Sequence, residues 1–249
     1  MTVAFVHGVP DTPFMWQPLI SSLGLSQSEY FAPALPGFGC GIPSGFSCTK
    51  EAYTDWLITQ IEQAVQASGE PIDIVGHDWG ALLTLRACSL RPDLIRSFAV
   101  ANALIDREYS GHRMARTWAT PVLGEVSMLL SSFMDMKQSL IDAGMPKEIA
   151  DHDVSYFDKR MRSSIVKLYR SAAGLNFRGS WVDELKNLPE AGMVLWGEHD
   201  PFVGIDVAER FHKMWGFPVH ILRDTGHWGL IEKSDETAAQ LKALWARAS

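Results

Sequence analysis

The stretch DIVGHDWGALL, residues 73–83, decides the fold. An apolar strand pattern runs into the pentapeptide GHDWG (76–80) and continues directly into a helical pattern. This is the form of a nucleophile elbow, whose tight strand-to-helix turn requires small residues on both sides of the nucleophile. An aspartate, Asp78, stands where a serine is usual. Taken alone, the pentapeptide also fits a glycine turn with a capping aspartate, so the rest of the chain must decide between the two.

Length and composition exclude several classes of protein. The chain has 249 residues, of which 47% are apolar and 20% charged, as in ordinary soluble domains. Its formal net charge is −7 and it lacks clusters of Lys and Arg, which gives no support to nucleic-acid binding. Three cysteines (Cys40, Cys48 and Cys88) have spacings that suit neither a disulfide framework nor a zinc site. No signal peptide and no membrane span is recognisable, and we expect a soluble cytoplasmic protein.

Short apolar runs alternate with helical patterns, which is typical of a parallel sheet covered by helices on both faces. A four-residue repeat from Tyr53 to Val65 predicts an amphipathic helix between the second and third strands. The alternation stops between about 105 and 188, where helical patterns predict an inserted cap on a core of residues 1–104 and 189–249. The predicted strands are 2–7, 30–35, 72–77, 97–102, 193–198 and 218–223.

Further polar residues follow other predicted strands. His7 and Gly8 come directly after the first strand, where an oxyanion-hole loop would lie, with the backbone N–H groups of Val9 and Trp79 as its donors. Asp200 and His227 follow the fifth and sixth strands. Because catalytic groups gather at the carboxyl ends of parallel strands, the order nucleophile, acid, histidine predicts a triad of Asp78, Asp200 and His227.

The motifs GHDWGA, HGVP and GHWGLIE resemble the α/β-hydrolase family, and within it the epoxide hydrolases and haloalkane dehalogenases that use an aspartate nucleophile. The resemblance implies an α/β fold of about six mostly parallel strands flanked by helices, an inserted helical cap, and neither cofactor nor metal. Two departures are visible. Only six residues precede His7, where the family commonly has two further strands, and Cys40 stands where the family often has a serine.

An aspartate nucleophile suits attack on saturated carbon. The carboxylate of Asp78 would displace a leaving group and form an alkyl ester, which water activated by His227 would then hydrolyse. For an epoxide, the resemblance implies a proton-donating tyrosine in the cap, and Tyr169, followed by Arg170, matches it. The family's second tyrosine has no counterpart at 120–126, so Tyr109 or Tyr156 could replace it. An epoxide hydrolase acting on a small apolar electrophile is the leading hypothesis.

Two alternatives stay open. A haloalkane dehalogenase would need side-chain N–H donors for the halide, and Trp79 with Trp118 or Trp181 could supply them. A hydrolase-like protein could also bind a small ligand in the same pocket without converting it. We expect neither nucleic acid nor membrane as partner, whereas a helical cap can serve for contacts in a homodimer.

Overall fold

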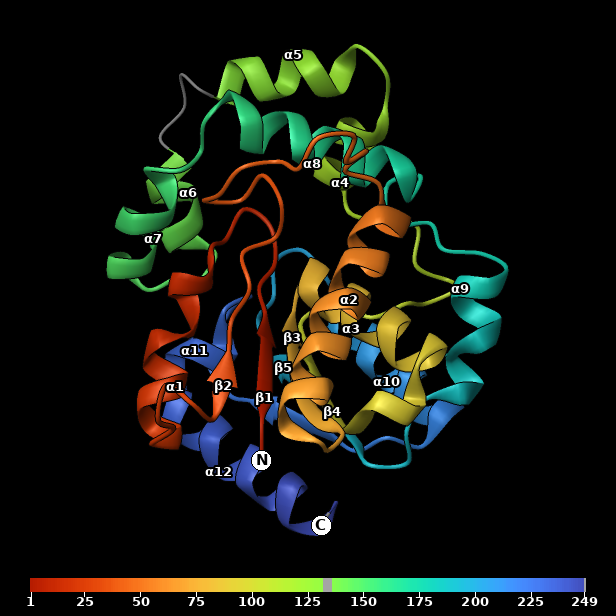
Figure 1. Ribbon diagram of the computed structural model, residues 1–249. Coiled ribbons are helices and arrows are strands. Elements are labelled where there is room, and N and C mark those ends of the chain that lie inside the picture. The colour runs from red at the N-terminus through yellow and green to blue at the C-terminus, as the bar shows by residue number, and fades with distance from the viewer. Residues whose placement is uncertain (132–135, 249) are drawn as a thin grey trace.

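The computed structural model describes residues 1–131 and 136–248, and a single six-stranded sheet runs through its centre (Figure 1). The strand order is β2-β1-β3-β4-β5-β6, and every neighbouring pair is parallel, which confirms the predicted sheet. The order reverses at β1, so the carboxyl ends of β1 and β3 flank a switch point, the usual place for a ligand. The strands are β1 (Val3–Val6), β2 (Tyr30–Phe31), β3 (Ile72–His77), β4 (Ile95–Ala101), β5 (Gly192–Gly197) and β6 (Val219–Leu222).

The second predicted strand, 30–35, is mostly wrong, because only Tyr30–Phe31 pairs with the sheet. Pro33 has no N–H to donate to a ladder, which limits such a segment to a short edge strand. Two residues later, the N–H of Leu35 donates to Nε2 of His7 at 3.0 Å instead of to a strand. The segment therefore leaves the sheet and fastens the loop that follows β1.

Helices cover both faces of the sheet, as expected (Figure 1). Side chains alternate along β1: Val3 and Phe5 pack with α1 and α12, whereas Ala4 and Val6 belong to the core beneath α2, α3 and α10. The predicted helix between β2 and β3 is confirmed as α2, capped by Thr49 and ended by a glycine with positive φ. The helices are α1 (Gln17–Leu23), α2 (Lys50–Ser68), α3 (Trp79–Leu90), α10 (Ile205–Trp215), α11 (Gly229–Glu232) and α12 (Ser234–Arg247).

The segment between β4 and β5 is helical, and its described residues, 105–131 and 136–188, contain no strand. Helices α4, α5 and α8 pack against one another above the carboxyl end of the sheet (Figure 1). The last helix, α9, instead lies against the core, where Arg86 of α3 donates to the backbone oxygen of Ser180. The cap boundaries at 105 and 188 stay predictions. The helices are α4 (Arg113–Ala119), α5 (Leu123–Leu130), α6 (Met136–Asp142), α7 (Lys147–Val154), α8 (Lys159–Ser171) and α9 (Ser180–Asp183).

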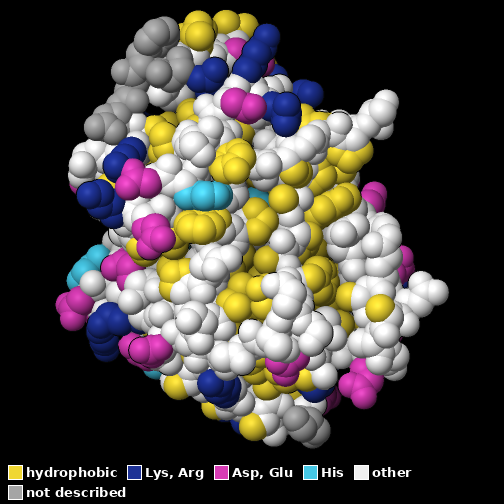
Figure 2. Space-filling view, turned by 60° about the vertical axis from the view of Figure 1, so that its left-hand side comes forward, with side chains coloured by type: hydrophobic (Ala, Val, Ile, Leu, Met, Phe, Trp, Pro, Cys, Tyr) yellow, Lys and Arg dark blue, Asp and Glu magenta, His cyan; other side chains and the backbone are white. Residues whose placement is uncertain are grey.

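Figure 2 shows one face of the molecule, with acidic and basic side chains scattered around its margins and apolar side chains gathered between them. Charges of both signs are interspersed there, so this face presents no field of a single sign. None of the helices in the described residues is long and apolar enough to cross a membrane.

Candidate active site

The elbow residue Asp78 sits between β3 and α3 with φ 51° and ψ −123°, a conformation that non-glycine residues rarely adopt. The two glycines of the motif are required by space. A Cβ at Gly80 would lie 2.0 Å from the backbone oxygen of Val6, and one at Gly76 would lie 2.5 Å from the oxygen of Gly80. The sequence of the elbow therefore permits a turn that pushes the Asp78 carboxylate out above the sheet.

The loop after β1 supplies the expected backbone donor. The N–H of Val9 donates to Oδ1 of Asp78 at 2.8 Å. The N–H of Trp79 also faces this carboxylate and helps to lower its pKa. Gly8 makes the approach possible, because a Cβ there would lie 2.4 Å from the Cβ of Asp78. Two N–H groups thus converge on the carboxylate, as in an oxyanion hole.

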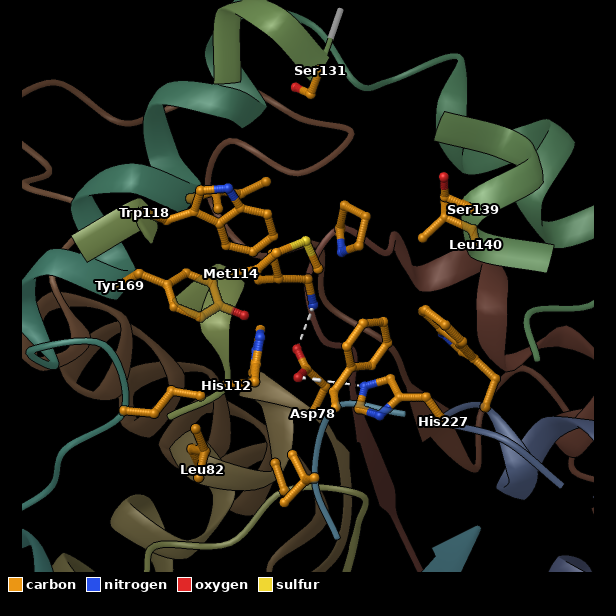
Figure 3. Close-up of a pocket in the computed structure, with 18 of the residues that line it drawn as sticks. Asp78, Leu82, His112, Met114, Trp118, Ser131, Ser139, Leu140, Tyr169 and His227 are labelled. Carbon is orange, nitrogen blue, oxygen red and sulfur yellow. Dashed lines mark hydrogen bonds and ion pairs between the residues drawn. The ribbon is translucent and has the colours of Figure 1, made fainter. Parts of the chain in front are cut away.

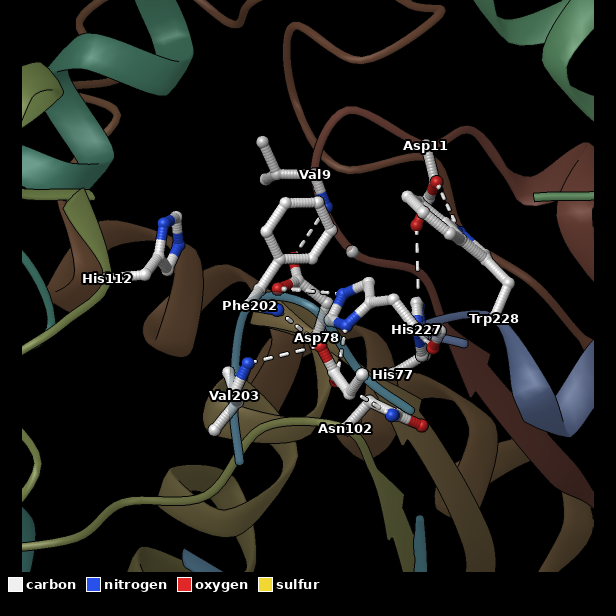
Figure 4. Close-up of polar contacts among 12 residues, drawn as sticks. Val9, Asp11, His77, Asp78, Asn102, His112, Phe202, Val203, His227 and Trp228 are labelled. Carbon is white, nitrogen blue, oxygen red and sulfur yellow. Dashed lines mark hydrogen bonds and ion pairs between the residues drawn. The ribbon is translucent and has the colours of Figure 1, made fainter. Parts of the chain in front are cut away.

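The three residues predicted as a triad lie together, although they are far apart in sequence (Asp78 and His227 are labelled in Figure 4). Nδ1 of His227 donates to Oδ2 of Asp200 at 2.7 Å, and its Nε2 lies 3.5 Å from Oδ2 of Asp78. His227 is 3% exposed, so the imidazole is shielded from bulk water. The ring is oriented by one carboxylate and presented to the other.

Asp200 is held by more than the histidine. Its Oδ1 accepts from the N–H groups of Phe202 and Val203 at 2.8 and 3.1 Å, in the loop after β5. Its Oδ2 also accepts from Nδ2 of Asn102 at 2.8 Å. Sequence reasoning missed Asn102, which follows β4 in left-handed backbone with φ 58°. An asparagine at the carboxyl end of a strand was the signal that could have revealed it.

The electrostatics of the triad favour two carboxylates and a protonated imidazole in the resting site. Burial would raise the pKa of Asp78, but the hydrogen bond and charge of His227 hold it below its ordinary value. The pKa of Asp200 is likewise lowered, against burial, by the charge of His227. Burial would lower the pKa of His227, but Asp200 and Asp78 together raise it to about 10. The site therefore keeps its nucleophile ionised.

An apolar cavity of about 230 Å³ lies over the carboxylate, between the sheet and the helices above it (Figure 3). Tyr169 of α8 is buried, and its hydroxyl points into the cavity towards Asp78. Burial and then the charge of Asp78 raise the pKa of this hydroxyl well above its ordinary value, so it holds its proton. Apolar side chains make up most of the remaining lining: Leu82, Leu104, Met114, Trp118, Ile165 and Phe202.

Sequence reasoning also missed His112, which lines the cavity beside Tyr169 (Figure 3). Its Nδ1 accepts from the N–H of Ala115 at 3.3 Å and caps the start of α4. A neutral imidazole that accepts at Nδ1 carries its proton at Nε2. Burial lowers the pKa of His112 to about 4, so the ring is neutral and offers an Nε2–H donor. A histidine preceding a helical pattern gave only a weak signal of this role.

The remaining predicted pocket residues divide into two groups. Tyr109 and Trp118 line the cavity. The hydroxyl of Tyr109, however, donates to the backbone oxygen of Phe202 at 3.1 Å, so its proton is already engaged. Tyr156 is 41% exposed and lines a different groove, and Trp181 stacks on Phe177 outside the cavity.

Trp79, predicted as a halide donor, is fully buried and its side chain does not line the cavity. Its indole packs edge-on against Tyr169 with ring centroids 5.2 Å apart. The Nε1–H makes no well-formed hydrogen bond within the described residues, but it faces the Tyr169 hydroxyl closely enough to moderate that pKa. Its side chain thus lies beneath the proton donor, because α3 turns it towards α8.

Possible metal ligands converge at one place in the described part of the chain, formed by Glu198, His199 and Asp224. His199 and Asp224 are exposed, and none of the three lines the cavity. Exposed groups of this kind are common without an ion.

Residues 3–240 match the model of a family described as the alpha/beta hydrolase family. An epoxide hydrolase of Neurospora crassa is 34% identical over 99 residues, which cover 38% of this chain and 28% of that protein. A haloalkane dehalogenase of Mycolicibacterium paratuberculosis is 26% identical over 105 residues, which cover 41% of this chain and 34% of that protein. These alignments thus span about a third of each curated relative.

Solved structures of similar fold extend over nearly the whole chain. The Cif epoxide hydrolase from Acinetobacter nosocomialis has a TM-score of 0.81 at 21% identity, covering 98% of this chain and 82% of its own. The haloalkane dehalogenase DbeA from Bradyrhizobium elkani has a TM-score of 0.75 at 20% identity, covering 99% and 91%. At this identity the likeness shows the fold alone. The choice between an epoxide and a haloalkane as substrate therefore depends on the residues of the site.

Proposed function

Since the chain belongs to the alpha/beta hydrolase family, we propose that it is an epoxide hydrolase that opens an epoxide to a vicinal diol. Asp78 is the nucleophile, His227 the base, Asp200 the residue that orients it, and Tyr169 the principal proton donor. The substrate is a small apolar electrophile, because the cavity is lined mainly by apolar side chains. No cofactor takes part.

The observation that carries this proposal is the pair of neutral donors across the cavity from the nucleophile (Figure 3). Tyr169 keeps its hydroxyl proton, and His112 keeps a proton on Nε2 because its Nδ1 is engaged with Ala115. An epoxide oxygen develops negative charge as it leaves and needs such donors. His112 therefore takes the role for which the sequence offered only Tyr109 or Tyr156.

The reaction has two steps. In the first, a carboxylate oxygen of Asp78 bonds to an epoxide carbon, the carbon–oxygen bond breaks, and the alkoxide takes a proton from Tyr169 or His112. Before the second step His227, which is protonated in the resting site, loses its proton, and the donor regains the one it gave up. His227 then takes a proton from water, which attacks the carboxyl carbon of Asp78, while Val9 and Trp79 stabilise the oxyanion. The diol leaves with that proton from His227, and the second water proton passes from Asp78 back to His227.

A haloalkane dehalogenase is the second candidate, favoured by the curated dehalogenase relatives. A leaving halide needs N–H donors that face the cavity. The side chain of Trp79 is not part of the cavity wall, and Val9 has no donor in its side chain. Trp118 does line the cavity, but its indole nitrogen lies on the side of the ring turned away from Asp78 (Figure 3). The donors near the nucleophile, Tyr169 and His112, therefore suit an epoxide better.

The test is to trap the ester. In His227→Gln the base is lost but the nucleophile remains, so the intermediate should accumulate and be visible in the intact mass. We expect an adduct with the full mass of an epoxide, absent in Asp78→Asn. An adduct equal to a haloalkane minus hydrogen halide would favour the second candidate. No adduct from broad panels of both compounds would leave a protein that binds ligands without covalent catalysis.

A further inference from the structure

Behind the catalytic base lies a buried polar network that the proposed reaction does not use (Figure 4). His77, which precedes the nucleophile, and Asp11, in the loop after β1, are both fully buried. Nε2 of His77 lies 2.9 Å from the backbone oxygen of His227, and its Nδ1 lies 3.4 Å from Oδ2 of Asp11. The other oxygen of Asp11 accepts from the indole N–H of Trp228 at 3.0 Å. Four residues thus form one connected group.

This network joins three of the loops that carry catalytic groups. His77 belongs to the elbow, Asp11 to the loop with the oxyanion-hole donor, and His227 with Trp228 to the loop of the base. On its other side, the base loop is held by the N–H of His227, which donates to the oxygen of Ala143 at 3.0 Å. The peptide groups on both sides of the catalytic imidazole are therefore anchored, one of them by a titratable side chain.

The proton inventory of the network follows from its geometry. A carbonyl oxygen only accepts, so Nε2 of His77 must carry a proton. A bare Nδ1 facing an ionised Asp11 would set two lone pairs against each other, so one more proton lies between them. Shared between the two, this proton leaves neither buried group as an unpaired charge.

We propose that His77 is a positioning residue for the second step, whose Nε2–H fixes the main chain of His227. The inference rests on the proposed function, because only a two-step reaction separates the work of the nucleophile from that of the base. Asp78 attacks without the base, so ester formation tolerates a displaced His227. Ester hydrolysis does not, since a shift of about 1 Å in a catalytic group can cost roughly 10²-fold in rate.

Two substitutions at one position separate the contacts. His77→Asn keeps a donor near Nδ1, facing Asp11, and removes the donor to His227. His77→Gln keeps a donor near Nε2 and removes the one facing Asp11. In single turnovers with an epoxide, H77N should slow hydrolysis of the ester by about 10²-fold and leave its formation close to wild type. H77Q should leave both steps close to wild type and is the matched control.

A second measurement needs no substrate. Hydrogen exchange of the peptide that contains the base loop should accelerate in H77N and stay unchanged in H77Q. Should an unpaired Asp11 destabilise H77Q, the double variant H77Q/D11N restores a neutral network, because asparagine still accepts from Trp228. Thermal melting then shows which variants are equally stable, and the rates of those variants are compared.

The outcomes are distinguishable. If the ester forms and H77N hydrolyses it at the wild-type rate, the positioning role is wrong and the proposed function stands. Equal slowing of both steps in H77N and H77Q would reduce His77 to a structural residue and also overturn the inference. If no ester forms in wild type, H227Q or H77N, the proposed function fails, and unchanged exchange of the base loop in H77N would overturn the positioning role as well.

Discussion

A methyl group added at Gly8 would overlap the side chain of the nucleophile, Asp78. A Cβ built there falls 2.4 Å from the Cβ of Asp78 and 2.7 Å from its Oδ1, whereas ordinary contacts begin at 3.4 Å. The loop after β1 and the elbow must therefore separate by about 1 Å in Gly8→Ala. The same movement draws the N–H of Val9 away from Oδ1, to which it now donates at 2.8 Å.

Both steps should suffer, and the second more than the first. Misplacing the carboxylate by about 1 Å lowers the rate of ester formation by roughly 10²-fold. Hydrolysis also depends on the oxyanion hole, and weakening one donor costs up to about 10²–10³-fold in addition. The free energy of unfolding should fall by only about 1–3 kcal/mol, the usual cost of overpacking. Activity is thus lost from a protein that still folds.

Single-turnover kinetics with mass detection of the ester separates the two rates, and thermal melting follows stability. Gly41→Ala is the matched control, because a Cβ at Gly41 has no atom within 4 Å and its φ is not positive. That variant should keep wild-type rates. If Gly8→Ala also forms and hydrolyses the ester at rates close to wild type, the close approach of loop and nucleophile does not position the carboxylate, and the reasoning is refuted.

Three further predictions follow from the charges and donors of the site. Tyr169→Phe and His112→Asn should each slow epoxide opening by about 10²-fold, as measured by stopped-flow kinetics. Neither variant should lower the melting temperature, since asparagine at 112 retains an acceptor that caps the helix. An unchanged rate would remove the substituted residue from the mechanism. Ester formation should persist in acid, because the pKa of Asp78 is lowered. The rate of ester hydrolysis should rise with pH through a pKa of His227 below about 10, since esterification removes one of the two carboxylate partners of His227. A hydrolysis rate that does not change with pH would contradict this. Asp153→Asn should raise the melting temperature at about pH 7.5 and have little effect at about pH 4. Burial raises the pKa of this carboxyl to about 6, so only above that pH does the folded protein bear the cost of a buried negative charge. An equal change of melting temperature at both pH values would contradict this.

Much of the fold was predictable because its signals are local. The glycines on both sides of Asp78 reflect backbone contacts within a few residues, and the apolar runs of β3, β4 and β5 report burial on both faces of the sheet. The second strand was overextended because a proline within an apolar run limits sheet pairing to its first residues.

The donors of the cavity were less predictable because they depend on where helices pack. Tyr109 and Tyr156 looked equivalent in the sequence, yet one faces the cavity with its proton engaged and the other lies on a different surface. His112 acquires its tautomer from the N–H group at the start of α4, and Trp79 is buried because α8 covers it. Such properties arise from contacts between elements, which no spacing along the chain encodes.

The sequence by itself determined the order and chemistry of Asp78, Asp200 and His227, because a strand-to-helix turn and the ends of parallel strands are set by local residue types. Only the tertiary structure decided which side chains face the substrate and which hold the base. The nitrogen of His112 that carries the proton is set by a hydrogen bond of 3.3 Å from Ala115. The contact from His77 to His227 joins two residues far apart in the chain at 2.9 Å. Hydrogen bonds form only over such distances. The packing of the elements therefore decides which of several residues that look equivalent in the sequence take part in the site.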